Sequence, residues 1–228
     1  MASNLHLLED AAAMLKHLLP EVVFVGGATL DLLVTDQGSG PVRSTYDVDV
    51  IVAADYADYS AFCDRLRDIG FENDTRSDAP LCRFLQGGLM LDVMSTDKGA
   101  LGFSNCWYEG AIQTAMPASL PSGTVIRLIA APFFLGTKME AFYDRGKNDF
   151  YLSHDLEDFI AVVEGREQLP EELASAPTDL RKYLAEAAAK LLANERFLEA
   201  LPGYVPGDSI SQRRVPIIIE RLVKMSEP

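Results

Sequence analysis

The sequence predicts an α/β or α+β core followed by a helical lobe. Short apolar segments typical of strands alternate with amphipathic helical patterns over residues 1–131, and helical patterns alone follow over residues 132–228. Strands and helices in alternation indicate a sheet covered by helices, and the later run of helices indicates a separate helical layer. We therefore expect residues 1–131 to form the core and residues 132–228 to form the helical lobe.

The first elements lead into a pair of glycines. Asn4–Leu19 is expected to be a helix, because leucine and alanine recur in it at three- and four-residue spacing and Pro20 follows. Val22–Val25 is wholly apolar and ends at Gly26-Gly27, which predicts a buried strand and a turn. A helix over 28–34 and a loop over 35–41, rich in glycine, serine and proline, come next.

The next expected strand, Asp47–Val52, carries two carboxylates. Alternate residues of a strand share a face, so Asp47 and Asp49 project together while Val48 and Val50 face the other way. Two adjacent acids on an apolar strand repel each other. A site for divalent cations is a natural explanation for their presence on one face.

A hairpin with a third acid is expected after a helix over 59–70. Arg83–Gln86 and Leu89–Met94 are predicted to be strands joined by a turn at Gly87-Gly88. An unpaired carboxylate inside an apolar strand is costly, so Asp92 needs a partner. Asp92 is therefore a candidate third metal ligand, and a pair with Arg83 across the hairpin is the alternative.

The remaining elements are mainly helical. Trp107–Leu120 is ambiguous between helix and strand. The other expected elements are a strand at Val125–Ile129, a helix at Phe134–Arg145, a helix at His154–Glu164 capped by Ser153, a long helix around Tyr183–Leu198 and a final helix at Ile217–Met225.

The composition is that of an acidic globular protein. Hydrophobic residues make up 48% of the chain and charged residues 24%, which is ordinary. The longest apolar run, Leu128–Gly136, is far shorter than the ~20 residues that span a bilayer, and the acidic N-terminal helix is unlike a signal peptide. We expect a cytoplasmic protein with no membrane partner, and three cysteines that are reduced, buried and inert (Cys63, Cys82 and Cys106).

The net charge of −14 limits the expected partners. General nucleic-acid binding needs lysine and arginine near the phosphates, so an acidic chain is not a general nucleic-acid binder. Residues 170–228 hold 8 basic and 9 acidic side chains. This segment is the less repulsive surface for a polyanion.

The glycine pair and the three acids together suggest metal-dependent chemistry on a nucleotide. Glycines before a helix let backbone N–H groups approach a phosphate closely. Carboxylates from neighbouring strands suit one or two Mg²⁺ ions, which are hard and also take phosphate oxygens as ligands. Two such ions would polarise the α-phosphate, activate a hydroxyl and hold pyrophosphate. The chain has no His/Cys cluster of the kind that binds zinc.

This arrangement resembles the polymerase-beta-like nucleotidyltransferase superfamily. That superfamily has Gly-Gly or Gly-Ser at a strand-to-helix turn, then Asp-x-Asp or Asp-x-Glu on a strand, and a third acid on another strand. The run Lys138…Arg145-Gly-Lys147-Asn-Asp, followed by Ser153-His-Asp155-Leu-Glu-Asp158, is similar to a stretch of the AbiEii/AbiGii toxin nucleotidyltransferases. The resemblance covers roughly residues 20–165. The interval from Gly27 to Asp47 is longer than in compact members, and the 35–41 loop can absorb the difference.

The resemblance implies an α+β fold with a mixed sheet flanked by helices. It also implies transfer of a nucleoside monophosphate from an NTP to an acceptor hydroxyl. Some family members modify the acceptor ends of tRNAs or are neutralised by an antitoxin, so tRNA is the favoured acceptor and a cognate antitoxin an expected partner. The implied roles are metal binding by Asp47, Asp49 and Asp92, nucleotide binding by Gly26, Gly27, Arg43 and Lys138, and catalysis by the three metal-binding acids with Lys138 and Asp155.

Each assignment has a structural alternative. Lys138 can lie along a helix surface, as most lysines do, and Asp155 is favoured at a helix N-terminus by the dipole. Arg43 can contact phosphate or pair with nearby acids. Two other functions remain open: transfer to a small cationic acceptor such as an aminoglycoside, which the acidic surface would attract, and nucleotide binding without catalysis.

Overall fold

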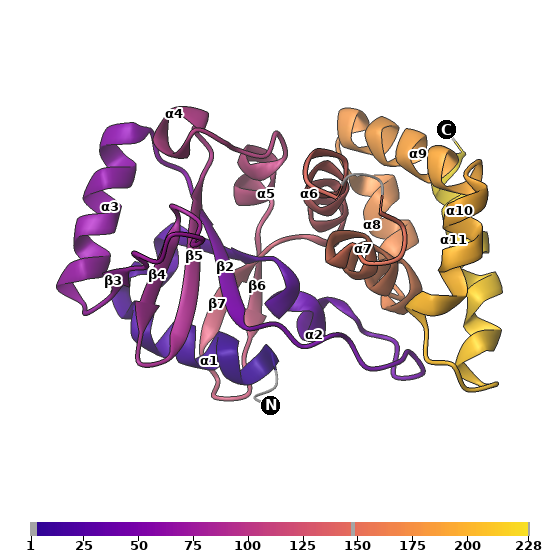
Figure 1. The fold of residues 1–228 in the computed structure, drawn as a ribbon, viewed down its shortest axis with the longest axis horizontal. Helices are drawn as coiled ribbons and strands as arrows, with labels where there is room; N and C mark the ends of the chain where they lie inside the picture. Colours follow the sequence, from indigo (N-terminus) through magenta and orange to yellow (C-terminus); the bar gives the residue numbers. More distant parts are fainter. Residues whose placement is uncertain (1–3, 147–148, 228) are drawn as a thin grey trace. The chain divides into compact units, whose positions relative to one another are not determined.

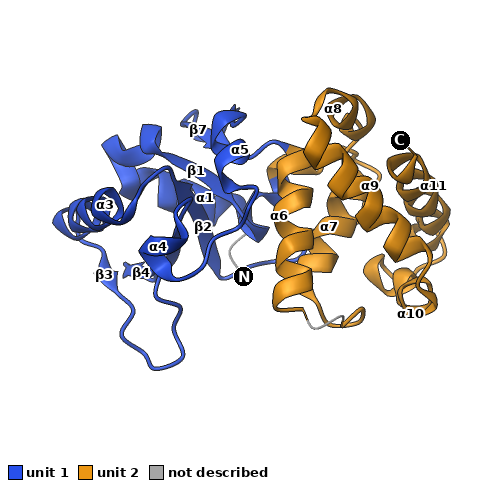
Figure 2. Ribbon diagram, turned by 90° about the horizontal axis from the view of Figure 1, so that it is seen from above, with its two compact units in different colours: residues 1–31, 43–130 blue, residues 32–42, 131–228 orange. Residues whose placement is uncertain are grey.

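The computed structural model describes residues 4–146 and 149–227, and its fold is shown in Figure 1. It has a mixed sheet flanked by helices and a helical C-terminal portion, so the expected α+β class is confirmed. The chain forms two compact units (Figure 2): unit 1 holds the chain up to Asp31 together with Arg43–Ala130, and unit 2 holds Leu32–Val42 together with the chain from Ala131. Lys147 of the AbiEii-like stretch lies outside the described residues.

The sheet of unit 1 has seven strands in the described part of the chain, in the order β3-β4-β5-β2-β1-β7-β6. The middle strand, β2, is antiparallel to β1 and parallel to β5. β1 and β7 are parallel, and the outer pairs are antiparallel. The strands are β1 (Val22–Val25), β2 (Asp47–Val52), β3 (Glu72–Asn73), β4 (Arg83–Gln86), β5 (Leu89–Ser95), β6 (Met116–Ser119) and β7 (Val125–Leu128).

Burial along the central strands follows the sequence pattern. β1 is buried throughout, as its apolar run predicts. In β2, Val48 and Val50 are fully buried while Asp47 and Asp49 are only half-buried, so the predicted division of the strand into an apolar and an acidic face is confirmed. α1 (Asn4–Leu15) packs against β2 and β5, and α3 (Tyr56–Asp68) is held to β5 by the Tyr59 hydroxyl, which donates to the Val93 carbonyl at 2.8 Å.

The first helix is shorter than expected. α1 ends at Leu15, and Lys16–Glu21 form a 3₁₀ helix that leads into β1. Lys16 has a φ of +50°, and a residue in this left-handed region cannot continue an α-helix. Leu18 is nevertheless fully buried, so the leucine periodicity correctly identified the buried side chains.

The ambiguous segment Trp107–Leu120 contains one helix and one strand. α5 (Tyr108–Gln113) is followed by β6 at the edge of the sheet. Cys106 lies in the loop that leads from α4 (Lys98–Leu101) to α5 and is exposed, so the expectation that all three cysteines are buried is wrong for Cys106 and correct for Cys63 and Cys82.

Unit 2 packs its helices around an aromatic core. The Phe142 and Phe150 rings lie 5.5 Å apart between centroids, and those of Phe150 and Phe197 6.2 Å apart. Its longer elements are α6 (Ala131–Asp144), α7 (His154–Gly165), α8 (Leu169–Ser175), α9 (Thr178–Leu192), α10 (Glu195–Ala200) and α11 (Val215–Ser226). Within residues 4–146 and 149–227, no helix has the length and apolar character needed to cross a bilayer.

The single long helix expected around Tyr183–Leu198 is wrong. The chain forms α9 and then α10, because the Asn194 side chain accepts hydrogen bonds from the N–H groups of Arg196 and Phe197. Asparagine at this position caps the start of a new helix. The expected cap at Ser153 is confirmed, since its hydroxyl accepts from the Leu156 N–H at the start of α7.

The segment 32–42, which begins at the end of α2 (Leu30–Leu33), packs within unit 2 although it precedes β2. The N–H groups of Thr35 and Asp36 both donate to the carbonyl of Gly165, at 2.9 and 2.8 Å, at the C-terminal end of α7. Arg166 donates to the Leu33 carbonyl at 2.8 Å. These bonds satisfy carbonyls that a helix end leaves without partners inside the helix.

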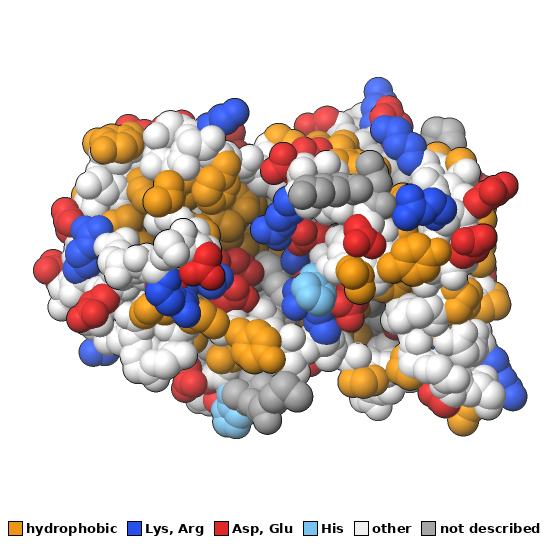
Figure 3. Space-filling view, viewed as in Figure 1, with side chains coloured by type: hydrophobic (Ala, Val, Ile, Leu, Met, Phe, Trp, Pro, Cys, Tyr) orange, Lys and Arg blue, Asp and Glu red, His pale blue; other side chains and the backbone are white. Residues whose placement is uncertain are grey.

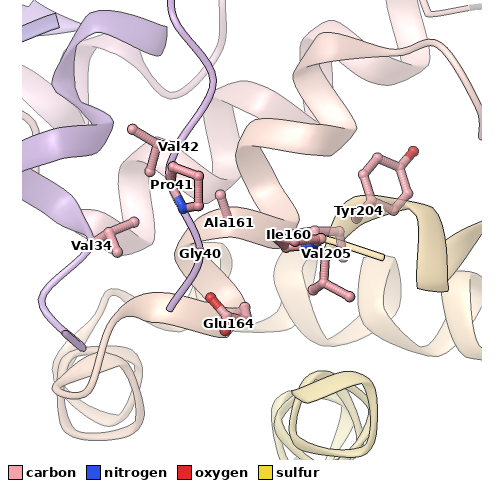
Figure 4. Close-up of a pocket in the computed structure, with 10 residues that line it drawn as sticks. Val34, Gly40, Pro41, Val42, Ile160, Ala161, Glu164, Tyr204 and Val205 are labelled. Carbon is pink, nitrogen blue, oxygen red and sulfur yellow. The ribbon is translucent and has the colours of Figure 1, made fainter. Parts of the chain in front are cut away.

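Arg214 fixes the same segment through two carboxylates. Its guanidinium forms ion pairs with Asp36 of the segment and with Glu164 of α7. The hydrogen bond from Arg214 lowers the pKa of Asp36. Figure 4 shows the cavity beside these groups, where Val34 and Pro41 of the segment face Ile160 of α7. Its volume of about 40 Å³ is well below the ~300 Å³ at which pockets for small-molecule ligands begin.

Candidate active site

The glycine turn after β1 packs directly against the carboxylate of Asp49. Gly26 has a φ of +71°, a backbone conformation that favours glycine. A Cβ placed on Gly26 would lie 1.8 Å from Asp49 Oδ2. The Thr29 hydroxyl donates to the Gly26 carbonyl at 2.7 Å and fixes the turn from the other side. Any side chain at Gly26 would therefore displace Asp49.

Strand pairing brings the three predicted acids into one group, which we call the carboxylate triad (Asp47, Asp49 and Asp92). β2 and β5 run parallel, and their register places Asp49 opposite Asp92. Neighbouring strands lie about 4.8 Å apart, so these two residues are adjacent, with Asp47 two residues along the same face of β2. Asp92 is buried and its side chain is only 10% exposed. Burial raises the pKa of Asp92, while the hydrogen bonds from Arg83 act in the opposite direction.

Arg83 joins two members of the triad. Its register position on β4 is opposite Asp92, and its Nε and Nη2 donate to Asp92 Oδ1 and Oδ2 at 2.7 and 2.8 Å. Nη2 also donates to Asp47 Oδ2 at 2.7 Å. The hydrogen bonds to Asp92 raise the pKa of the guanidinium. The alternative expectation for Asp92, a pair with Arg83 across the hairpin, is thus present in the structure.

The triad fits Mg²⁺ by the chemistry of its donors. All three residues offer carboxylate oxygens, which a hard divalent ion prefers. The arrangement is not that of a preformed metal cage: in the part of the chain that the structure describes, no three His, Cys, Asp or Glu side chains are grouped so as to hold a metal ion. Arg83 supplies the positive charge between Asp47 and Asp92 instead.

Arg43 lies just before β2, and its backbone helps to position that strand. The Asn4 side chain donates to the Arg43 carbonyl at 3.0 Å and accepts from the Thr45 N–H at 3.1 Å. The Thr45 hydroxyl in turn donates to Asp47 Oδ1 at 2.7 Å. Contact between the Arg43 side chain and a phosphate stays a prediction.

The two predicted residues of the second half also meet, in what we call the Lys138 cluster (Lys138, Arg145, Asp155 and Asp158). Lys138 is on α6, and its Nζ lies 2.6 Å from Asp158 Oδ2 and 3.3 Å from Asp155 Oδ1 on α7. Lys138 is 8% exposed. The alternative in which Lys138 extends along the helix surface into solvent is wrong, because two buried acids hold its ammonium inside unit 2.

The surroundings of Asp155 favour its ionised form. Its burial acts to raise its pKa, but the hydrogen bonds from Arg145 and the charges of Lys138 and Arg145 together lower that pKa. Arg145 donates from both Nε and Nη2 to the Asp155 carboxylate at 2.9 Å. Asp155 also lies in the first turn of α7, where the helix dipole favours a negative charge.

Sequence reasoning missed two contacts of these residues. Asp158, with 0% exposure, was not predicted as a site residue, although its three-residue spacing from Asp155 on a helix was a signal that both acids share a face. Thr45 was also not predicted. Its contact with Asp47 is between residues two apart in a non-helical segment, and no periodicity indicates it.

The surface charge is mixed in spite of the acidic composition. On the face shown in Figure 3, Lys and Arg side chains stand among Asp and Glu side chains over both units. A net charge of −14 therefore does not correspond to a uniformly acidic surface on that face.

Solved structures that are similar to this chain include the following two. A nucleotidyltransferase-like antigenic protein from Paracoccidioides brasiliensis has a TM-score of 0.53 and 20% identity, over 87% of this chain and 93% of its own. JHP933 from Helicobacter pylori has a TM-score of 0.51 and 12% identity, over 99% of this chain and 93% of its own. No protein-family model and no curated protein matches the chain.

These similarities establish the fold. The chain shares its architecture, over most of both chains, with a protein described as nucleotidyltransferase-like. Identities of 20% and 12% carry no residue roles from those proteins to this one.

Proposed function

We propose that this protein is a metal-dependent nucleotidyltransferase that moves a nucleoside monophosphate from an NTP to an acceptor hydroxyl. The favoured acceptor is a tRNA, in the manner of the AbiEii/AbiGii toxins, with action in the cytoplasm and a cognate antitoxin as partner. The observation that carries the proposal is the parallel register of β2 and β5, which places Asp49 opposite Asp92 and beside the glycine turn. The nucleotidyltransferase-like fold supports it.

The proposed chemistry divides between the two groups of residues. Mg²⁺ held by the carboxylate triad would neutralise charge on the α-phosphate and on the departing pyrophosphate. Asp92 would bind metal and help to orient or deprotonate the acceptor hydroxyl. Gly26 and Gly27 would let the backbone approach the triphosphate, with Arg43 beside it. A contact of Lys138 with the triphosphate, as a point charge, stays a prediction from the resemblance and would require its ammonium to leave Asp155 and Asp158.

The test is nucleotide transfer by purified protein. The protein is incubated with Mg²⁺, total RNA and each of the four α-³²P-labelled NTPs in turn. We expect one NTP to label RNA of tRNA size, and Asp49→Asn to reduce that labelling by about 100-fold or more, since even groups that only support metal ligands typically contribute 10–100-fold. Asp68→Asn, an exposed position on α3, is the matched control and should label like the wild type.

Two results would contradict separate parts of this proposal. Undiminished labelling by Asp49→Asn would remove the metal mechanism. If no NTP labels RNA while a small-molecule extract is labelled, the tRNA acceptor is wrong and the transferase activity remains.

Nucleotide binding without catalysis is the second candidate. It is favoured by the ion pairs that tie Asp47 and Asp92 to Arg83, because an arginine in this position can replace a metal as the counter-charge. Calorimetry would measure NTP binding, and pyrophosphate release would measure turnover. NTP binding with no pyrophosphate release over hours, in the presence of RNA and metabolite extracts, would support the non-catalytic function.

A further inference from the structure

We infer that Arg83 is a built-in counter-cation that a divalent metal must displace from Asp47 and Asp92. The inference rests on the proposed metal-dependent function and concerns how the metal site is regulated. It predicts that the protein is stable without metal and binds metal weakly, and that the affinity is limited by the arginine.

The hydrogen bonds from Arg83 bind Asp47 and Asp92 tightly. Three N–H···O bonds of 2.7–2.8 Å link one guanidinium to Asp92 and Asp47. The Arg83 side chain is 17% exposed, so solvent screens these bonds little. Two parallel bonds from a planar guanidinium to one carboxylate are the strongest form of this interaction.

A metal ion and Arg83 would compete for the same carboxylate oxygens. Both oxygens of Asp92 accept from Arg83. Of the two oxygens of Asp47, Oδ2 accepts from Arg83 and Oδ1 accepts from Thr45. A metal ion shared by Asp47 and Asp92 would need lone pairs directed at the space where the guanidinium lies. Two cations cannot occupy that space together, because their repulsion at a few ångströms in a partly buried site is large.

Arg83 also has a role in the metal-free protein. Without a cation, Asp47 and Asp92, which both accept from the same Arg83 nitrogen, would be two nearby negative charges, one of them buried. Leaving a buried charge without its partner is strongly destabilising. Arg83 therefore stabilises the metal-free sheet, and a metal can take over that role.

The first experiment compares Mn²⁺ binding by wild type, Arg83→Gln and the control Arg76→Gln, using electron paramagnetic resonance. Arg76 is an exposed arginine that pairs with Asp74 in the segment between β3 and β4, so its substitution changes the net charge equally. We expect Arg83→Gln to bind Mn²⁺ at least about 10-fold more tightly than wild type. Arg76→Gln should bind like wild type.

Thermal unfolding distinguishes a counter-cation from an arginine with a purely structural role. Arg83→Gln should melt below wild type without metal, and saturating Mn²⁺ should raise its melting temperature by more than it raises that of wild type. A loss of stability that Mn²⁺ does not reverse would overturn the inference. Equal or weaker Mn²⁺ binding by Arg83→Gln would overturn it too, as would the absence of binding by both proteins.

A measurement on the wild type covers the case in which Arg83→Gln does not fold. The ¹⁵N-resolved Arg83 Nε–H signal, hydrogen-bonded to Asp92 in the metal-free protein, should shift and exchange faster with water as Mg²⁺ saturates the site. An unchanged signal at saturation overturns the inference.

The labelling assay separates this inference from the proposed function. Tighter Mn²⁺ binding by Arg83→Gln in a protein that transfers no nucleotide supports the counter-cation and contradicts the function. Transfer by wild type together with unchanged Mn²⁺ affinity of Arg83→Gln supports the function and overturns the counter-cation.

Discussion

At the residue scale, Gly26 couples the glycine turn to the acidic strand through direct contact with Asp49. Gly26→Ala should lower the free energy of unfolding by about 2–5 kcal/mol, since it adds a strained left-handed residue to an overpacked contact. Urea unfolding followed by circular dichroism would measure this loss.

The matched control for this substitution is Gly123→Ala. Gly123 also has a positive φ, +86°, but a Cβ there would meet no atom within 4 Å. Gly123→Ala should lower the free energy of unfolding only by the cost of the backbone conformation, about 1–2 kcal/mol. Equal losses for the two variants would show that Asp49 moves aside without cost.

The Asp92–Arg83 pair illustrates what sequence can predict about single residues. A two-residue turn at Gly87-Gly88 fixes the hairpin register, so the position opposite Asp92 follows from counting along the chain. Both glycines have positive φ, as that turn requires. The third bond, from Arg83 to Asp47, depends on the parallel register of β2 and β5. Local patterns contain no information about which distant strands become neighbours.

At the scale of elements, the Lys138 cluster joins α6 to α7. Asp155→Asn should reduce the free energy of unfolding by about 1–3 kcal/mol at pH 7, because it weakens charged hydrogen bonds with Lys138 and Arg145. Urea unfolding at a series of pH values is the measurement. Asp144→Asn, an exposed position on α6, is the control and should unfold like the wild type.

The difference between wild type and Asp155→Asn should depend on pH in a defined direction. The pKa of Asp155 is lower in the folded protein than the ordinary value of 3.8. The stability it contributes is therefore fully present above the unfolded pKa and lost as the pH falls through the folded pKa. The difference should be constant from pH 7 to 5 and shrink below pH 4. A difference that grows in acid would contradict this assignment.

Element boundaries were predictable where a cap or a turn residue specified them. Ser153 begins α7 as expected. Asn194 is a capping residue of the same kind, but the alanine- and leucine-rich residues around it favour a helix so strongly that the break was not predicted. Lys16 ends α1 without any residue type that signals an end.

At the scale of the whole molecule, the segment 32–42 belongs to unit 2 although it lies between two parts of unit 1 in the chain. A fragment ending at residue 131 would therefore contain this segment without α7 and Arg214, to which it is bonded. We expect random-coil chemical shifts for residues 32–42 in the ¹⁵N spectrum of such a fragment. Folded shifts for these residues would contradict the prediction.

The order in which the two units alternate along the chain limits how the gene can be rearranged. The chain passes between the two units three times, near residues 31, 42 and 130. A recombination event with one breakpoint near residue 131 would transfer the helices but leave behind the segment 32–42, with Asp36 as the partner of Arg214. Exchange of a complete helical unit between related genes requires three coordinated breakpoints. This unit is therefore expected to be inherited together with its sheet rather than acquired as a separate module.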